Sequence, residues 1–131
     1  NSDWAAQMVT VEHLASGKLY ERLAEFRAIY RKKRDLMCAR LDELAEHYPL
    51  RYVKPGGGVY IWVELPRRIS AKSLLTRARR HGVTFMTGES FFEEPSRGRS
   101  HIRLNYSYPS LDEIERGMDA LGLALGEALE G

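Results

Sequence analysis

The stretch KPGGGVYIWVELP, residues 54–66, decides the fold of this chain. It opens with a lysine, a proline and three glycines, which predicts a turn and a loop. Apolar residues then occupy every second position: Val59, Ile61, Val63 and Leu65. Because side chains alternate between the two faces of a strand, this run predicts a β-strand with one apolar face, ended by Pro66. The other face carries Tyr60, Trp62 and Glu64.

A second strand is predicted by the run HIRLNYS, residues 101–107. One of its faces carries Ile102, Leu104 and Tyr106, and the other carries His101, Arg103, Asn105 and Ser107. A shorter strand is predicted at residues 83–86. Residues 87–98 contain two glycines and a proline, so they are predicted to form a loop, with Phe91 and Phe92 as its apolar anchor.

Three helices are predicted around these strands. The first runs over residues 19–46, where one face repeats at steps of three and four: Leu19, Leu23, Phe26, Tyr30, Lys33, Met37, Leu41 and Leu44. Ser70 caps the second helix, which Gly82 closes. The third begins with a capping box of Ser110 and Glu113. Its buried stripe is Ile114, Met118, Leu121 and Leu125.

Together these elements predict an α+β fold, with a small, mostly antiparallel sheet of three or four strands covered by helices. The length of 131 residues and the 44% hydrophobic content fit one domain over residues 1–131. Disorder is not expected at a net charge of +2. The chain has no apolar run long enough for a membrane helix and no signal peptide at its first residues. A single cysteine, Cys38, fits a reducing cytoplasm.

The charge is unevenly spread along the chain. Residues 67–80 contain six basic residues and no acid. A basic stripe can indicate a nucleic-acid surface, but the basic residues of the first helix alternate with acids at helical spacing. No helix-turn-helix or zinc-finger spacing occurs. We therefore expect a solvated helix face, without DNA as a direct partner of this chain.

Most residue types that carry chemistry are isolated here. The four histidines, His13, His47, His81 and His101, never fall at metal-ligand spacing, so no metal is expected. Cys38 lies in a helical stretch and is interpreted as structural. The three glycines at 56–58 are followed by a strand and lack the Lys-Ser/Thr of a phosphate loop, so they predict no nucleotide site.

Arg103 is the exception. An arginine in the middle of a strand loses hydration and side-chain entropy unless a group pairs with it. Its planar guanidinium suits a carboxylate, which it can bind through two parallel hydrogen bonds. A structural salt bridge, or an edge-strand arginine that reaches water, explains the position as well, and the spacing alone leaves these alternatives open.

Four segments resemble the class I/II aminotransferases, which are fold-type I pyridoxal-phosphate enzymes. Residues 54–66 are similar to their P-x-G-G-M-F-x-W-x-x-L-P segment, and residues 82–92 to G-V-x-x-x-P-G-x-x-F. Residues 101–107 resemble the family's R-L-x-F/Y strand, and residues 111–121 its final helix. All four occur in the family's order. The resemblance is to the carboxy-terminal small domain, and to the 2-aminoadipate and aromatic aminotransferase group within the family.

The resemblance implies that the large domain, with the catalytic lysine and the pyridoxal-phosphate site, lies outside this chain. No catalytic or cofactor-binding residue is then expected here, and no cofactor bound to this chain alone. Arg103 would bind the α-carboxylate of an amino-acid or 2-oxo-acid substrate. Gly57, Gly58, Tyr60 and Phe91 would form part of the site wall. The helix over 19–46 would link the two domains, in a homodimeric parent.

The chain also resembles a second group, namely the aminotransferase-like half of GntR-type regulators of the MocR subfamily. In such a parent the domain would sense an effector, and DNA would be bound only by a further amino-terminal domain. A stand-alone interaction domain is a third interpretation. The chain departs from the family at Thr87, where proline is usual, and at Val59, where methionine is frequent.

Overall fold

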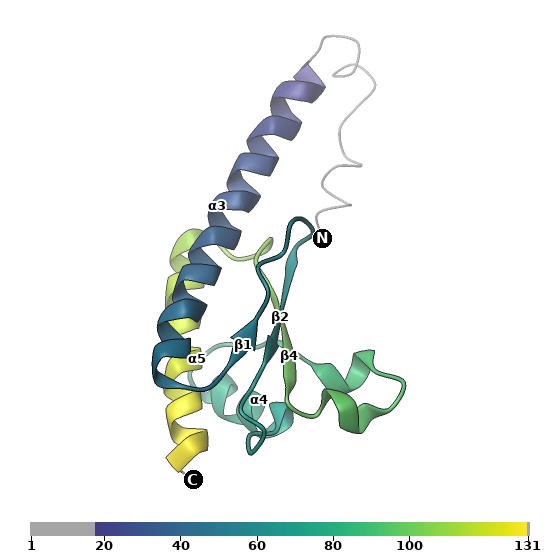
Figure 1. Cartoon of the computed structure of the whole chain (residues 1–131). Coiled ribbons are helices and arrows are strands. Elements are labelled where there is room, and N and C mark those ends of the chain that lie inside the picture. The colour runs from purple at the N-terminus through teal and green to yellow at the C-terminus, as the bar shows by residue number, and fades with distance from the viewer. Residues whose placement is uncertain (1–17, 131) are drawn as a thin grey trace.

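The computed structural model describes residues 18–130 (Figure 1). The expectations for the amino-terminal segment, including the lack of a signal peptide and the role of His13, lie outside these residues. The helices are α3 (Lys18–His47), α4 (Ala71–Arg80) and α5 (Leu111–Glu130). The strands are β1 (Arg51–Tyr52), β2 (Tyr60–Glu64), β3 (Met86–Thr87) and β4 (His101–Asn105). Two 3-10 turns, η1 (Gly88–Phe91) and η2 (Pro95–Gly98), lie between β3 and β4.

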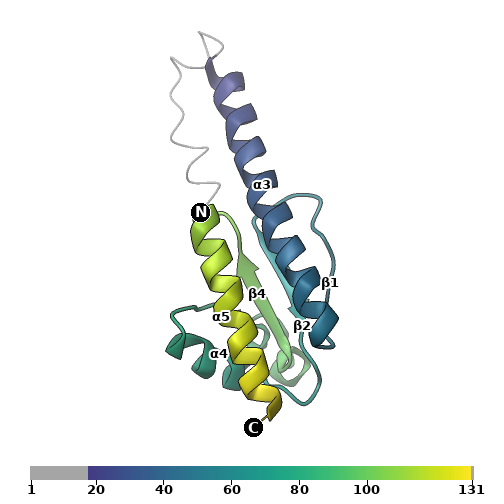
Figure 2. The same cartoon turned by 90° about the vertical axis from the view of Figure 1, so that its left-hand side faces the viewer.

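The strands form one four-stranded sheet in the order β1-β2-β4-β3, with every neighbouring pair antiparallel. In Figure 1, α3 and α5 lie to the left of this sheet and the two 3-10 turns to its right. Figure 2, seen from the helical side, shows α3 and α5 side by side in front of the strands. The predicted α+β fold is thus confirmed, including a small antiparallel sheet covered by helices.

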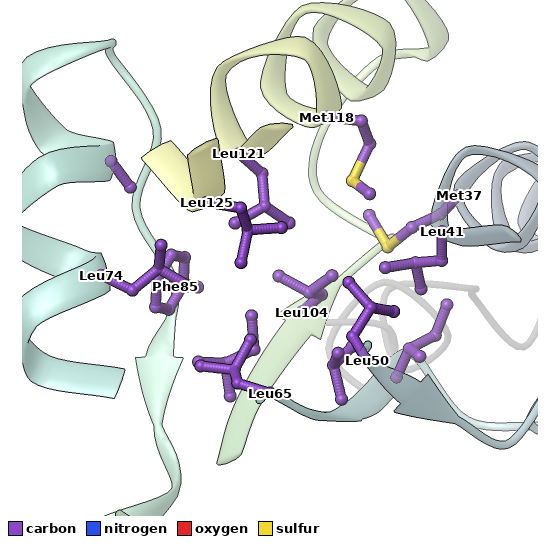
Figure 3. Packing of buried hydrophobic residues seen from close by; sticks show 14 of the residues in the cluster. Met37, Leu41, Leu50, Leu65, Leu74, Phe85, Leu104, Met118, Leu121 and Leu125 are labelled. Atoms are coloured by element: carbon purple, nitrogen blue, oxygen red, sulfur yellow. The ribbon is translucent and has the colours of Figure 1, made fainter. Parts of the chain in front are cut away.

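The core lies between the helices and one face of the sheet, which we call the inner face. In Figure 3, Leu121 and Leu125 of α5 lie above Leu104 of β4, between Leu74 of α4 and Leu41 of α3. All five are buried, as the alternation in the strands and the stripes in the helices predict. The buried cluster includes side chains from all three helices and both central strands, so it fixes these elements relative to one another.

Helix α3 has two different halves. Near its carboxyl end Met37, Cys38 and Leu41 are buried in the core. Toward the amino end the helix extends beyond the sheet (Figure 1), and the stripe residues Leu23 and Phe26 are only partly buried. The predicted apolar stripe is therefore buried over part of its length only, because there is no sheet beneath the first half.

Both predicted serine caps are present. The Ser70 hydroxyl accepts the Ser73 amide at 3.1 Å. Ser110 and Glu113 form a reciprocal capping box, with hydrogen bonds of 3.0 and 3.1 Å. Across residues 18–130 no helix is long and apolar enough to cross a bilayer.

Strand limits differ from the prediction at three places. The strand expected at residues 83–86 is wrong in position, because the Val83 amide still bonds the carbonyl of α4 at Ala78, and pairing starts only at Met86. The strand predicted over 101–107 ends at Asn105, whose side-chain oxygen accepts the amides of residues 107 and 108 and so turns the chain. The two-residue strand β1 was not predicted, because it is too short for alternation to be visible.

Candidate functional site

The second face of the sheet, which we call the outer face, carries the side chain singled out from the sequence. Arg103 lies in the middle of β4, directly opposite Trp62 of β2. Its guanidinium carbon is 3.8 Å from the centroid of the Tyr60 ring and 4.2 Å from that of Phe91. Both distances are well within the roughly 6 Å range of a cation–π contact. Arg103 is thus held between one ring from β2 and one from the turn η1.

The polar contacts of Arg103 are unusual for an arginine in a sheet. Its Nε atom is buried and has no hydrogen-bond partner in the described part of the chain. Among residues 18–130 no carboxylate lies within salt-bridge distance of its guanidinium. Within residues 18–130, a structural ion pair is therefore not what holds this side chain. A cation that is sheltered by two rings, with no acid of the described residues beside it, is suited to binding an external anion.

Further aromatic side chains extend the wall beside Arg103. Trp62 meets the ring of Phe91 edge to face at 5.3 Å, and the ring of Phe92 at 6.3 Å. Phe92 in turn lies 5.4 Å from the His101 ring, whose Nδ1 is buried without a partner among the described residues. Trp62 is 40% exposed and Phe91 41% exposed, so this wall is open on one side.

A hollow of about 670 Å³ runs along the edge of the sheet next to Arg103. Its lining includes Tyr60, Met86 and Asn105 together with the first turns of α5. A space of this size is in the range that small-molecule sites occupy. Tyr60 of β2 and Arg103 of β4 therefore border an accessible volume, whereas Phe91 of η1 does not line it.

Gly57 and Gly58 lie apart from this arrangement. They line a different hollow, together with Arg27 and Arg31 of α3. Gly58 has a φ of +79°, a backbone conformation that favours glycine, and its carbonyl accepts a hydrogen bond from the buried Tyr106 hydroxyl. The structure thus brings Arg103, Tyr60 and Phe91 together and leaves the two glycines elsewhere. Their role as a site wall stays a prediction.

Within residues 18–130, three lysines are engaged in contacts away from Arg103. Lys72 pairs with Glu89 at 3.0 Å, and Lys54 pairs with Asp35 at 3.0 Å. Lys33 donates to the carbonyl of residue 107. No lysine lines the hollow beside Arg103, and residues 18–130 contain no cluster of three or more potential metal ligands. The chemistry that this face offers is anion binding next to aromatic surface.

Trp62, Phe92 and His101 were not named as site residues from the sequence, although the alternation of residues 101–107 places His101 on the face of Arg103. The alternation of β2 does place Trp62 on the face of Arg103, and that signal could have been used. The positions of Phe91 and Phe92 depend on how residues 87–98 fold back, for which the sequence gives no periodic signal.

Comparisons with known proteins show which proteins share this fold and sequence. No family model matches the chain. The 2-aminoadipate transaminase of Thermus thermophilus is 37% identical over 119 residues, which are 91% of this chain and 29% of that protein. The HTH-type transcriptional regulator YdfD of Bacillus subtilis, itself uncharacterised, is 28% identical over 93% of this chain and 24% of the regulator.

Among solved structures, the α-aminoadipate aminotransferase LysN of Thermus thermophilus superimposes with a TM-score of 0.80 at 35% identity. The match covers 92% of this chain and 30% of LysN. The chain is therefore a small domain of the aminotransferase type. It is related to both aminotransferases and aminotransferase-like regulators, and it spans about 29% of the length of the first curated relatives that it matches.

Proposed function

We propose that this chain is the substrate-carboxylate-binding small domain of a pyridoxal-phosphate-dependent aminotransferase, which moves an amino group between an amino acid and a 2-oxo acid. The observation that carries the proposal is Arg103, which lies on an open sheet face between two aromatic rings and has no carboxylate partner within residues 18–130. Every amino-acid and 2-oxo-acid substrate has a carboxylate that can supply the missing partner.

Arg103 binds this carboxylate through two parallel N–H donors, which fix the direction of the substrate as well as its charge. Tyr60 and Phe91 restrict the movement of the guanidinium, because its carbon atom lies within cation–π distance of both rings. Orientation of this kind lowers the entropic part of the barrier. When the domain closes over the substrate, Trp62 and Phe91 exclude water from the same space.

The cofactor belongs to a large domain that supplies the lysine and the phosphate-binding groups. Bound there, pyridoxal phosphate provides the electron sink for amino-group transfer. Within the described residues, the contacts of Lys33, Lys54 and Lys72 leave none of these lysines beside Arg103. LysN, the relative with the TM-score of 0.80, was solved with N-(5'-phosphopyridoxyl)-L-leucine, which joins cofactor and amino acid in one molecule.

The first half of α3 serves as the connection to that large domain. Tyr20 and Ile29 are exposed there, and large apolar side chains at a surface often mark a protein contact. Gly57 and Gly58 lie beside the same half of the helix and so would border the domain boundary. A homodimeric parent and a cytoplasmic location are part of the same proposal.

The test compares Arg103→Lys with wild type in the full-length protein. Lysine keeps the charge and loses the two-pronged geometry, so KM for an amino acid should rise roughly tenfold or more. The decarboxylated amine of the same amino acid has no carboxylate, and its slow reaction should hardly change. Arg51→Lys is the matched control, because Arg51 lies on the same face in a long ion pair with Glu64. Equal losses for both substrates would reject the carboxylate role.

A measurement on this chain alone tests whether the cofactor is bound by another domain. Incubation with pyridoxal phosphate followed by borohydride should give no stoichiometric pyridoxyl label at a single lysine. Scattered, substoichiometric labelling of exposed lysines is the expected background. A single fully labelled lysine, located by mass spectrometry, would contradict the assignment of the cofactor to another domain.

The second candidate is an effector-sensing domain of a GntR/MocR-type regulator, and the similarity to YdfD favours it. In that case Arg103 binds the carboxylate of an effector that is not turned over, and DNA is bound by a separate amino-terminal domain. Product formation from an amino donor and a 2-oxo acid separates the two. A protein that binds the amino acid in an Arg103-dependent manner and yields no keto product is the regulator.

A further inference from the structure

Two buried glycines hold the turn that places Phe91 on Arg103. Gly88 begins η1 and Gly98 ends η2. A methyl group added to Gly98 would lie 2.3 Å from the carbonyl carbon and the carbonyl oxygen of Gly88. One added to Gly88 would lie 2.7 Å from the Cβ of His101 and 2.8 Å from the carbonyl oxygen of Gly98. Real Cβ atoms do not approach backbone atoms this closely, so the two turns are in direct backbone contact that only glycine permits.

This contact determines where the aromatic rings lie. Phe91 is the last residue of η1, and its ring is the second of the two rings that pack on the guanidinium of Arg103. The other ring, Tyr60, belongs to β2 and is fixed by the register of the sheet. Of the two rings on Arg103, Tyr60 is therefore positioned by the sheet, and Phe91 is positioned by the contact between Gly88 and Gly98.

The glycine contact is separate from the hydrophobic core. No residue of η1 or η2 belongs to the buried cluster that joins the three helices to the sheet. A change that pushes the two turns apart therefore has little reason to unfold the domain. Its direct consequence is a displaced Phe91 ring, followed by a guanidinium that is no longer confined on that side.

We propose that Gly88 and Gly98 are positioning residues: their backbone contact sets Phe91 against Arg103 and so orients the guanidinium that receives a carboxylate. The importance of this for catalysis rests on the proposed function. The structural half, in which the glycines hold the ring and the ring holds the arginine, can be tested without it.

The first experiment uses this chain and NMR. A side chain above the face of an aromatic ring is shifted upfield, so the Arg103 Nε–H signal should lie upfield of that of the exposed Arg51. In Gly98→Ala and in Gly88→Ala it should move part of the way toward the Arg51 position, because the Tyr60 ring stays in place, and nuclear Overhauser contacts between Phe91 and Arg103 should vanish. The matched control is Gly117→Ala in α5, where an added methyl meets only Val83 at an ordinary 3.6 Å. The control should leave the Arg103 signal in place.

The second experiment asks whether the glycines act through Phe91. In the full-length protein, Gly98→Ala and Phe91→Leu should each raise KM for an amino acid roughly fivefold and leave the decarboxylated amine unaffected. The double variant should be no worse than either single variant, because residues that act through one contact are not additive.

The possible outcomes separate this inference from the proposed function. If Gly98→Ala leaves the Arg103 signal unmoved, or if the wild type lacks the contacts between Phe91 and Arg103, the inference is wrong. Global unfolding of both glycine variants would overturn it too, since it would make them folding residues. If the signal moves as expected but wild type does not discriminate the amino acid from its amine, the glycine contact stands and the proposed function fails.

Discussion

The two faces of the same two strands are built from different kinds of residues. On the inner face Ile61, Val63, Ile102 and Leu104 are buried under the three helices. Their neighbours on the outer face, among them Trp62 and Arg103, have no helix of residues 18–130 above them and meet aromatic rings from β2 and from residues 91 and 92. One residue step along β4 therefore passes from the centre of the core to the centre of the candidate site.

On one strand, stability and the candidate function therefore depend on different side chains. The inner face is held by buried apolar area, which is insensitive to direction. The outer face is held by directional contacts of rings with a cation, and it keeps a donor, Arg103 Nε, without a partner in the described chain. A substitution on one face should therefore change mainly the property that this face supports.

The largest expected effect is on the inner face. Ile102 is 0% exposed, and Ile102→Ala removes buried methyl groups and leaves a cavity, so it should lower the free energy of unfolding by about 2–5 kcal/mol. Trp62→Ala removes a larger side chain from the open face and should cost roughly 1 kcal/mol, since only ring contacts are lost. Urea unfolding of both variants gives the comparison. A Trp62 variant as unstable as the Ile102 variant would show that the outer face is part of the core.

A smaller effect is expected from two arginines in opposite settings. Arg40 links α3 to α5 through ion pairs with Glu115 at 3.0 Å and with Asp119, and it also pairs with Glu43 of its own helix at 3.2 Å. The hydrogen bond with Asp119 raises the pKa of the Arg40 guanidinium. Arg40→Met should cost about 1–2 kcal/mol, a value limited by the solvent exposure of the three acids.

Arg103→Met, by contrast, should change stability by less than about 1 kcal/mol. Within residues 18–130, the change breaks no ion pair and removes a buried donor that lacks an acceptor. It also replaces the contact of the guanidinium with the rings by a contact of the methionine sulfur, which packs well against aromatic rings. Thermal or urea unfolding of Arg40→Met and Arg103→Met measures the two losses of stability side by side. The comparison fails if Arg103→Met is the more destabilising of the two, because a structural role for Arg103 would then be the simpler explanation.

Much of the inner face could be predicted from the sequence, for physical reasons. Alternation in residues 59–65 and the stripe of α5 depend only on the period of a strand and of a helix, and both report burial directly. The capping box of Ser110 and Glu113 is a local signal in the same sense. Arg103 could be singled out from the sequence as well, because a charged residue in the middle of a strand loses hydration unless a group pairs with it.

The surroundings of Arg103 could not be predicted in the same way. Phe91 reaches it from a segment of twelve residues, 87–98, that folds into two 3-10 turns and has no period to read. The contact between Gly88 and Gly98 joins residues ten positions apart through their backbones, and a glycine in a sequence does not tell which atoms approach it. For the same reason Gly57 and Gly58, which the resemblance places at the site wall, lie in another hollow.

The smallest expected effect is a pH dependence of the folding stability, and it involves two groups on the inner side of the sheet. Burial raises the pKa of the Cys38 thiol above its ordinary value of 9.0. Burial, together with the hydrogen bond to Asp42, raises the pKa of the Tyr52 hydroxyl as well. In both cases the unfolded chain ionises first. The stability that these groups contribute is therefore complete below the unfolded pKa and is lost as the pH rises from there toward the folded pKa.

We accordingly expect the urea midpoint of wild type to fall above about pH 9, and to fall less steeply in Cys38→Ala, where one of the two groups is absent.

The same burial predicts a slow reaction of Cys38 with a thiol reagent. At 4% exposure, the thiol should react at pH 8 only as fast as the domain opens. Ile102→Ala should speed this labelling, because it weakens the layer that covers the thiol, whereas Arg103→Met should not. Equal acceleration by both variants would mean that the two faces open together, and the separation of stability from function along β4 would then be lost.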